Sequence, residues 1–397
     1  MKNRSWIILK CLFLAIILNG LISCEKEGDR LPVPVVHYNP DRSVLIYMAG
    51  HNSLSDFCGE NMDSIISGMS NIHSSANILI YVNNNTDNPT LWKVAGDSDG
   101  NVLKEKIKEY EMHNSVDPAI MQQIIQETFS LYPAKEKGLI LWSHATGWLP
   151  SPNYQKVNRR KRSFGEHRID GTRNSAYLEL WDLREVLEET MVDFDFIFFD
   201  ACYMGAVEVV YELKDLADYL LVSPTEVMGL GFPYQNIVPL LCRDKLDYQA
   251  IAQSYSDYYD GSLRYAGVAG YFNGEGSISL VKTDKIEELA TCYRTIRSEF
   301  NDRFSSVNSA EIQQLGRPSY RNLFFDFQNL IQAATPERLN DFNEKLNQVV
   351  VFKGNTPRFI EIEIRQNGGL TLFLPEANPS EKNRDAYTHL RWYDAIH

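Results

Sequence analysis

The sequence carries few positive charges for its length. Its 397 residues include 39 Lys and Arg against 52 Asp and Glu, which gives a formal net charge of −13 at pH 7. Proteins that bind nucleic acid present a basic face to the phosphate backbone. The acidic balance therefore argues against nucleic acid as the main partner.

Cysteines are also few, and their spacing is not that of a metal site. There are six, and no two form a CxxC pair. Four of them belong to the chain that we expect to fold: Cys58, Cys202, Cys242 and Cys292. Four scattered cysteines in a large domain do not make a disulfide framework, even in an oxidising compartment. The sequence therefore predicts at least one free thiol and no metal site.

Internal repeats and low-complexity tracts are absent as well. Hydrophobic residues make up 44% and aromatic residues 12% of the chain, which indicates a well-packed globular protein rather than a disordered one. The length allows two domains, or one large domain with an extension. We expect a monomer.

The N-terminus is typical of an exported lipoprotein. Basic residues among the first ten precede an apolar segment, Cys11 to Ile22, that is short for a membrane span. Leu21 to Cys24 reads Leu-Ile-Ser-Cys and resembles the bacterial lipobox, in which the cysteine becomes the lipidated first residue of the mature protein. An ordinary signal peptide or an uncleaved anchor is the alternative. We expect lipid at Cys24 and a membrane-anchored protein at the periplasmic face or the cell surface.

From residue 43 onward, patterns typical of strands and helices alternate. Helical crossovers between strands imply a mostly parallel sheet covered on both faces, so the fold class is α/β. Strands are expected at 43–48, 77–82, 138–142, 194–199 and 219–222, helices at 54–72, 117–131, 178–191 and 205–217, and a hairpin at 90–110. The predicted divisions are a lipoprotein signal (1–24), a polar tether (25–41), a sheet domain (42–244) and an α+β C-terminal domain packed on the sheet (245–397).

A cysteine lies at the junction between a buried strand and a helix. Cys202 follows the aromatic run 194–199 and precedes a helical pattern. At a helix start, the backbone N–H groups and the helix dipole favour a negative charge, which predicts a lowered thiol pKa and a nucleophile. An inert, buried cysteine is the alternative.

A histidine follows the preceding predicted strand of the sheet. His144 comes directly after the strand 138–142, and catalytic groups collect at the carboxyl ends of parallel strands. A thiol with a histidine in reach makes a nucleophile with a proton partner. Gly147 and Gly205 follow the two residues closely, and the N–H groups of Cys202 and Ala145 could face an oxyanion. His144 could instead be an ordinary hydrogen-bonded histidine at a strand end.

Two short motifs carry a family resemblance. Ser143 to Trp148 (Ser-His-Ala-Thr-Gly-Trp) and Asp200 to Gly205 (Asp-Ala-Cys-Tyr-Met-Gly) resemble the clostripain family of cysteine peptidases, relatives of caspases, gingipains and legumain. Weaker similarity extends from about residue 43 to 376. The resemblance implies a caspase-like sheet, a Cys202–His144 dyad and cleavage after a basic residue of a protein or peptide substrate.

The resemblance also implies how substrate charge is recognised. Asp200 would lie in the pocket for the substrate's Arg or Lys, where a partly desolvated carboxylate binds a guanidinium strongly. Glu226, in the loop after the strand 219–222, is a second candidate acid. Each could instead be structural, Asp200 as a turn residue and Glu226 as a solvated loop charge.

The sequence departs from the family at two positions. Ala145 stands where the family commonly has Gly, and His51 stands where it often has an acid. The second departure leaves a calcium requirement, known in some relatives, unsupported, and no other cofactor is expected. His51 and Asn52 follow a third strand of the same edge, so we expect them to border the cleft.

A basic run lies in the loop after His144. Arg159, Arg160, Lys161 and Arg162 would ordinarily form a solvated surface. In clostripain-like enzymes this loop carries a self-cleavage site, which predicts maturation by a cut within the run, before Ser163. A catalytically silent binding lipoprotein of the same fold, and a peptide ligase using the same acyl-enzyme, are alternatives to the endopeptidase.

Overall fold

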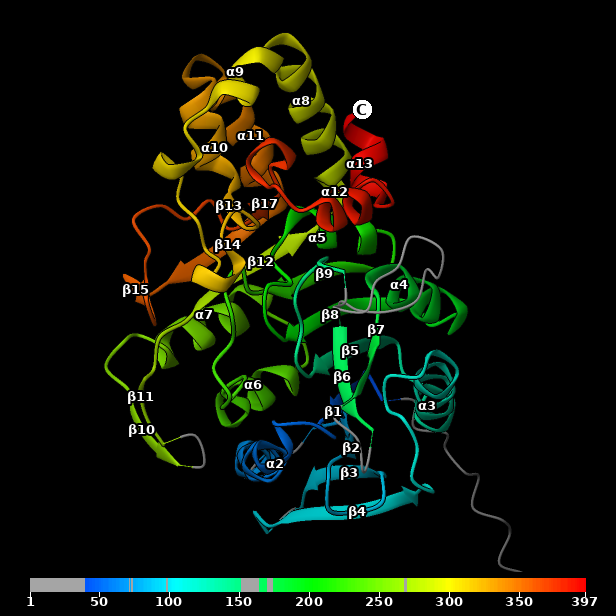
Figure 1. The fold of residues 1–397 in the computed structure, drawn as a ribbon. Helices are drawn as coiled ribbons and strands as arrows, with labels where there is room; N and C mark the ends of the chain where they lie inside the picture. Colours follow the sequence, from blue (N-terminus) through cyan, green and yellow to red (C-terminus); the bar gives the residue numbers. More distant parts are fainter. Residues whose placement is uncertain are drawn as a thin grey trace, which may run out of the picture. The chain divides into compact units, whose positions relative to one another are not determined.

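A single large sheet is the centre of the fold. The computed structural model describes residues 40–70, 72, 74–97, 99–150, 164–169, 174–267 and 270–397, except for the side chains of 265–272. Within these ranges nine strands pair in the order β14-β12-β9-β8-β5-β1-β2-β3-β4 (Figure 1). Their bounds are β1 Arg42–Ala49, β2 Asn77–Asn83, β3 Thr90–Gly96, β4 Val102–Glu109, β5 Glu136–Trp142, β8 Phe194–Asp200, β9 Ala217–Val222, β12 Ser277–Lys282 and β14 Val350–Asn355.

The middle of the sheet is parallel. Strands β1, β2, β5, β8 and β9 pair in parallel, and their apolar side chains are buried on both faces. Four helices lie between these strands along the chain: α2 Ser55–Met69, α3 Pro118–Leu131, α4 Leu180–Glu189 and α5 Val207–Leu213. Asp117 caps α3 by accepting hydrogen bonds from the N–H groups of Ala119 and Ile120. The predicted α/β class, with a mostly parallel sheet flanked by helices, is confirmed.

Antiparallel strands close the two edges of the sheet. At one edge β3 and β4 form the predicted hairpin, and the exposed lysines of β4 mark it as an outer strand. At the other edge β12 pairs antiparallel to β9, and β14 pairs antiparallel to β12. Because β12 and β14 come from beyond residue 245, the division expected there does not coincide with a boundary of the sheet.

Helices cover both faces of the sheet. On one face α2 packs with α6 Tyr234–Leu241 and α7 Tyr248–Tyr258, and on the other α3, α4 and α5 pack with the C-terminal helices. Figure 1 shows α2, α6 and α7 on one side and α3 and α4 on the other. The C-terminal helices are α8 Ile286–Glu299, α9 Asn301–Ser306, α10 Phe327–Ala334, α11 Leu339–Val349, α12 Glu381–Tyr387 and α13 Arg391–Ile396.

Short hairpins and single helical turns complete the described chain. The two-stranded pairs are β6 Phe164–Arg168 with β7 Ser175–Leu178, β10 Arg264–Gly267 with β11 Gly270–Asn273, β13 Phe325–Asp326 with β17 Thr371–Leu372, and β15 Arg358–Phe359 with β16 Ile362–Glu363. The 3₁₀ turns are η1 Thr283–Lys285, η2 Ser309–Glu311, η3 Pro318–Tyr320, η4 Pro336–Arg338 and η5 Pro375–Ala377. Strand β17 is limited to Thr371–Leu372, which pair with Asp326 and Phe325.

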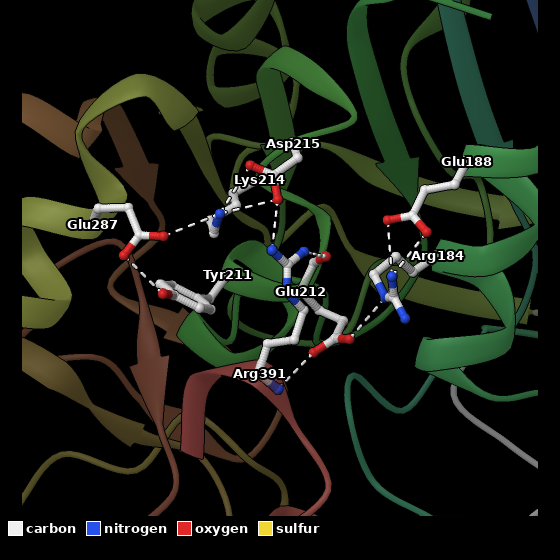
Figure 2. A network of polar contacts seen from close by, with 8 residues as sticks. All are labelled: Arg184, Glu188, Tyr211, Glu212, Lys214, Asp215, Glu287 and Arg391. Atoms are coloured by element: carbon white, nitrogen blue, oxygen red, sulfur yellow. Dashed lines mark hydrogen bonds and ion pairs between the residues drawn. The ribbon is translucent and has the colours of Figure 1, made fainter. Parts of the chain in front are cut away.

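A polar network joins the C-terminal helices to the sheet layer (Figure 2). The Arg391 side chain of α13 lies 2.6 Å from Asp215, and its backbone N–H donates to Glu212 over 3.0 Å. Glu212 also accepts a hydrogen bond from Arg184 of α4, and Lys214 pairs with Glu287 of α8. Helices α4, α5, α8 and α13 are thus connected around the buried Glu212 carboxylate.

Candidate active site

The two predicted catalytic residues follow adjacent strands. Strands β5 and β8 pair in parallel with Trp142 opposite Asp200, so the residues after each strand emerge at the same edge of the sheet. His144 is the second residue after β5, and Cys202 is the second after β8. The right-handed crossover through α4 therefore places both where the sequence predicts.

His144 and Cys202 line one cavity of about 210 Å³. Its wall is formed by His144, Ala145, Thr146, Gly165, Glu166, Tyr177, Cys202, Glu226 and Tyr320. Five segments distant in sequence meet there: the residues after β5, the β6–β7 hairpin, the turn after β8, the loop after β9 and the 3₁₀ turn η3. The predicted oxyanion residues and one of the two predicted acids are among them, and the other acid, Asp200, is not.

Cys202 is a partly exposed residue, and the groups around its thiol shift the thiol pKa in opposite directions. Val227 N–H donates to Sγ over 3.3 Å, and a hydrogen bond from the Ala145 backbone also favours the thiolate. Burial, followed by the charge of Glu226, raises the thiol pKa to about 12. The predicted lowering of this pKa is wrong, because burial and the Glu226 charge dominate and α5 begins only at Val207, beyond the turn that carries Cys202.

The turn that carries the nucleophile is fixed by backbone contacts. Tyr203 adopts a left-handed conformation with φ 60°, and its N–H donates to Thr225 O over 2.8 Å. A Cβ on Gly205 would lie 2.5 Å from the backbone of Pro224, and one on Gly147 would lie 2.7 Å from Tyr203 O. These glycines allow the loops of the site to approach one another, so they are needed for assembly of the site itself.

His144 is held by a residue of the first strand's loop. Ser53 Oγ lies 2.8 Å from His144 Nε2. When the serine oxygen accepts from an Nε2–H, the imidazole keeps Nδ1 as the nitrogen that can take up a proton. The neighbouring Asn52 side chain donates to the backbone carbonyls of Ala49 and Glu166, which shapes the loop that presents Ser53.

Glu226 faces the cavity and is paired with an arginine. Its Oε2 lies 3.2 Å from Nη1 of Arg317. Burial raises the pKa of this carboxyl, and Arg317 opposes the rise. Glu226 can therefore place a negative charge beside the nucleophile, as a site for a substrate cation requires.

Asp200 lies on the inner side of the same wall. It is buried, and its Oδ2 accepts hydrogen bonds from Phe232 N–H (2.8 Å) and Tyr234 O–H (2.9 Å). Among the described residues its second oxygen has no hydrogen-bond partner, and burial raises the pKa of the carboxyl to about 7. Gly231 covers it so closely that a Cβ there would lie 2.5 Å from Oδ2. Asp200 thus anchors the loop 228–234.

Comparisons with known proteins agree with this geometry. The sequence profile of the clostripain family matches residues 46–397. The chain belongs to the clostripain family. Clostripain of Hathewaya histolytica is 30% identical over 129 residues, which cover 31% of this chain and only 24% of that protein.

Solved structures of the clostripain family share the whole fold. A secreted C11 cysteine protease from Bacteroides thetaiotaomicron, in complex with an irreversible peptide inhibitor, is 30% identical with a TM-score of 0.76. An inactive zymogen of a C11 protease from Parabacteroides distasonis is 30% identical with a TM-score of 0.74. Each match covers 90% of this chain and 99% of the other. This chain is therefore a clostripain-like cysteine peptidase with a caspase-like fold.

Several residues of this clostripain-family site are not predicted from the sequence. They are Ser53, Glu166, Tyr177, Arg317 and Tyr320. None belongs to a motif, and Arg317 and Tyr320 lie in the C-terminal part, in which the sequence shows no chemistry. By contrast, the sequence predicts that His51 and Asn52 border the cleft. Both are buried, and neither lines the cavity.

Other predictions for this family member have no structural test. Cys24 and the basic run from Arg159 to Arg162 lie outside the described residues. Within the described ranges, no group of three or more His, Cys, Asp or Glu side chains could hold a metal ion. No helix in these ranges is both long and apolar enough to cross a membrane.

Proposed function

We propose that this protein is an exported, lipid-anchored endopeptidase that hydrolyses the peptide bond after Arg, and also after Lys. The supporting observation is the cavity that Cys202 and His144 share with the Glu226 carboxylate. A thiol, an imidazole and a carboxylate supply a nucleophile, a proton carrier and a counter-charge for a basic side chain.

In the proposed acylation, His144 takes the thiol proton while the Cys202 sulfur attacks the peptide carbonyl carbon. A C–S bond forms, and the carbonyl π electrons move to the oxygen, which the N–H groups of Cys202 and Ala145 stabilise. The tetrahedral intermediate collapses with cleavage of the C–N bond, and His144 donates its proton to the departing amine. The acyl group remains on Cys202 as a thioester.

In the proposed deacylation, His144 removes a proton from a water molecule that attacks the thioester carbonyl. The C–S bond breaks, the carboxylic acid leaves, and the sulfur regains a proton from His144. Because the thiol of the empty site has a raised pKa, proton transfer to His144 accompanies substrate binding and attack. The hydrogen bond between Ser53 and His144 keeps the imidazole oriented through both steps.

The substrate's basic side chain is proposed to bind against the wall 223–234. Glu226 faces the cavity from this wall, and Asp200 holds the wall from behind through Phe232 and Tyr234. Asp200 contacts a guanidinium in this proposal only when the loop 228–234 moves off it. The two acids therefore have separable roles that substitution can assign.

The activity is tested with fluorogenic peptides ending in Arg, Lys or Asp. Wild-type protein is expected to cleave after Arg and Lys only, and Cys202→Ala is expected to abolish turnover. Cys292→Ala, which removes another partly exposed thiol, is the matched control and should retain full activity. Absence of turnover by the wild type on every peptide would favour a binding protein of the same fold.

The source of specificity is tested by Asp200→Asn and Glu226→Gln. If Asp200 reads the substrate charge, Asp200→Asn loses the preference for Arg over a neutral residue while some cleavage remains. If Glu226 reads it, the same loss follows Glu226→Gln. A preference that survives both substitutions would contradict the proposed wall.

A further inference from the structure

The Glu226 carboxylate in the active-site cavity has a partner from a distant part of the chain. Arg317 Nη1 lies 3.2 Å from Glu226 Oε2, although the two residues are 91 positions apart in sequence. This places a guanidinium of the protein on the carboxylate where a substrate cation is proposed to bind. The charge and the hydrogen-bonding geometry of a substrate arginine are thereby reproduced within the molecule.

The backbone of Arg317 is held while its side chain is accessible. Its N–H donates to the Tyr203 hydroxyl over 3.3 Å, and its carbonyl accepts from Tyr320 N–H over 2.7 Å. Tyr203 itself is buried and stacks on Phe324, with ring centroids 4.4 Å apart. The Arg317 side chain is 42% exposed. The guanidinium can therefore leave Glu226 for solvent without movement of the chain that supports the nucleophile.

We propose that Arg317 is a specificity-determining residue that competes with the substrate. Its guanidinium occupies Glu226 in the empty enzyme, and a basic side chain of the bound peptide takes its place. This inference rests on the proposed function, because it assumes cleavage of basic peptides. In this proposal Arg317 raises the KM for basic peptides, because the substrate must displace its guanidinium from Glu226.

The size of the effect follows from the strength of the ion pair. Partly exposed pairs of this kind are weak, so displacement lowers affinity for the basic peptide by about two- to fivefold. The same competition has no effect on a peptide that is neutral at the position facing Glu226.

The test compares matched peptides on wild-type enzyme and Arg317→Gln. The peptides share one sequence and differ only in the residue before the cleaved bond, which is Arg or Lys in the charged peptides and citrulline in the neutral counterpart. We expect Arg317→Gln to lower KM by about two- to fivefold for the charged peptides. KM for the neutral counterpart and kcat for both should stay unchanged.

Three variants control the experiment. Arg321→Gln removes a nearby exposed arginine that does not line the cavity and should behave as wild type. Arg317→Lys keeps the positive charge, so its KM for the charged peptides should stay close to the wild-type value. In Glu226→Gln the further substitution Arg317→Gln should change nothing. Thermal unfolding of each variant checks that the fold is retained.

Several outcomes overturn the inference. An equal change in KM for charged and neutral peptides would show that Arg317 only supports the cavity, and a raised KM for charged peptides would show that it binds them together with Glu226. An effect of Arg317→Gln that persists in the Glu226→Gln background would exclude the competition. These results differ from failure of the proposed function, in which the wild type itself cleaves no basic peptide.

Discussion

The resting state of Cys202 is decided by its immediate neighbours. Burial and Glu226 raise the pKa of the thiol, while the N–H groups of Val227 and Ala145 oppose the rise. The empty site therefore stores the nucleophile as a thiol, which resists alkylation and oxidation better than a thiolate does. Reactivity then depends on His144 and on the substrate that brings the two groups together.

Glu226→Gln should make the thiol more acidic. Removal of the Glu226 charge leaves the nearby Arg317 without its counter-charge, and both changes favour the thiolate. The midpoint of the pH dependence of iodoacetamide alkylation at Cys202 is expected to move down by on the order of one unit. Glu361→Gln, at an exposed site, should leave the midpoint in place. An upward shift would contradict the assigned influence of Glu226.

Ser53→Ala should lower activity without loss of the fold. The variant loses the 2.8 Å contact to His144 Nε2, and a hydrogen bond of this kind contributes about 1 kcal/mol, so kcat should fall roughly fivefold. The pH profile of kcat should shift as well, since the imidazole loses a partner that favours one tautomer. Ser55→Ala, at the first residue of α2, removes the hydrogen bond from Asn85 N–H and is the nearby control.

At the scale of elements, α5 connects the nucleophile to the C-terminal part. It begins at Val207, directly after the turn that carries Cys202, and its Glu208 carboxylate accepts the Phe373 N–H over 2.7 Å. Glu208 is fully buried, and its second oxygen has no hydrogen-bond partner. Burial raises the pKa of Glu208 to about 8. The helix behind the active site is therefore least stable when this group is charged.

The pH dependence of stability should report Glu208. The carboxyl ionises near 4.5 in the unfolded chain but only near pH 8 in the folded protein, so its contribution to the free energy of unfolding falls as pH rises through this interval. Glu208→Gln keeps an acceptor for Phe373 N–H and removes the charge. We expect it to raise the free energy of unfolding by roughly 2–4 kcal/mol at pH 8.5 and by much less at pH 4.

Chemical denaturation at the two pH values measures this difference. Glu381→Gln, at an exposed position at the start of α12, is the control for a general charge effect and should change stability little at either pH. Equal effects of Glu208→Gln at pH 4 and pH 8.5 would show that packing, and not ionisation, sets its contribution.

At the scale of the whole molecule, the active site combines segments that are far apart in the sequence. They range from Ser53, near the start of the sheet domain, through Glu226, near its end, to Tyr320 in the C-terminal part. Strand β6 starts at Phe164, two residues after the basic run, and Gly165 N–H donates to His144 O over 2.8 Å. The chain that follows the proposed self-cleavage site thus forms part of the cavity wall. Maturation at this site would change the chain next to the catalytic histidine.

Replacement of the basic run by alanine should block maturation. In the variant with Arg159, Arg160, Lys161 and Arg162 all changed to Ala, we expect a single chain on denaturing gels, where wild-type protein yields two fragments. Cys202→Ala should also remain a single chain if the cut is made by the enzyme itself, as the self-cleavage hypothesis requires. Mass spectrometry of the new N-terminus should find Ser163. Two fragments from the all-alanine variant would contradict this site.

The lipid anchor is tested on the full-length chain. Wild-type protein expressed in a bacterial host should incorporate an alkyne-labelled fatty acid and fractionate with membranes, whereas Cys24→Ser should do neither. Cys11→Ser, inside the predicted signal, is the control. Soluble wild-type protein without label would contradict the predicted lipobox.

The sequence by itself determined the main elements and the placement of the predicted dyad, Cys202 and His144, at one edge of the sheet. Apolar runs of strand length alternate with segments of helical periodicity, some of which begin at a capping residue such as Asp117, and this alternation specifies the parallel sheet. The topology of the sheet then brings the residues after β5 and β8 to one edge. Cys202 and His144 are recognisable for this reason: each lies in a local pattern, and the rules of crossover connections make their strands neighbours.

Only the tertiary structure decided the surroundings of that dyad. The contacts of His144 with Ser53 and of Glu226 with Arg317 join residues 91 positions apart in each case, and no local pattern encodes such pairs. Burial likewise raises the thiol pKa of Cys202 and determines the anchoring role of Asp200. It also determines how much the ionised Glu208 lowers the free energy of unfolding. Burial depends on which segments pack together, so the chemistry at the site follows from the assembled fold and not from the motifs alone.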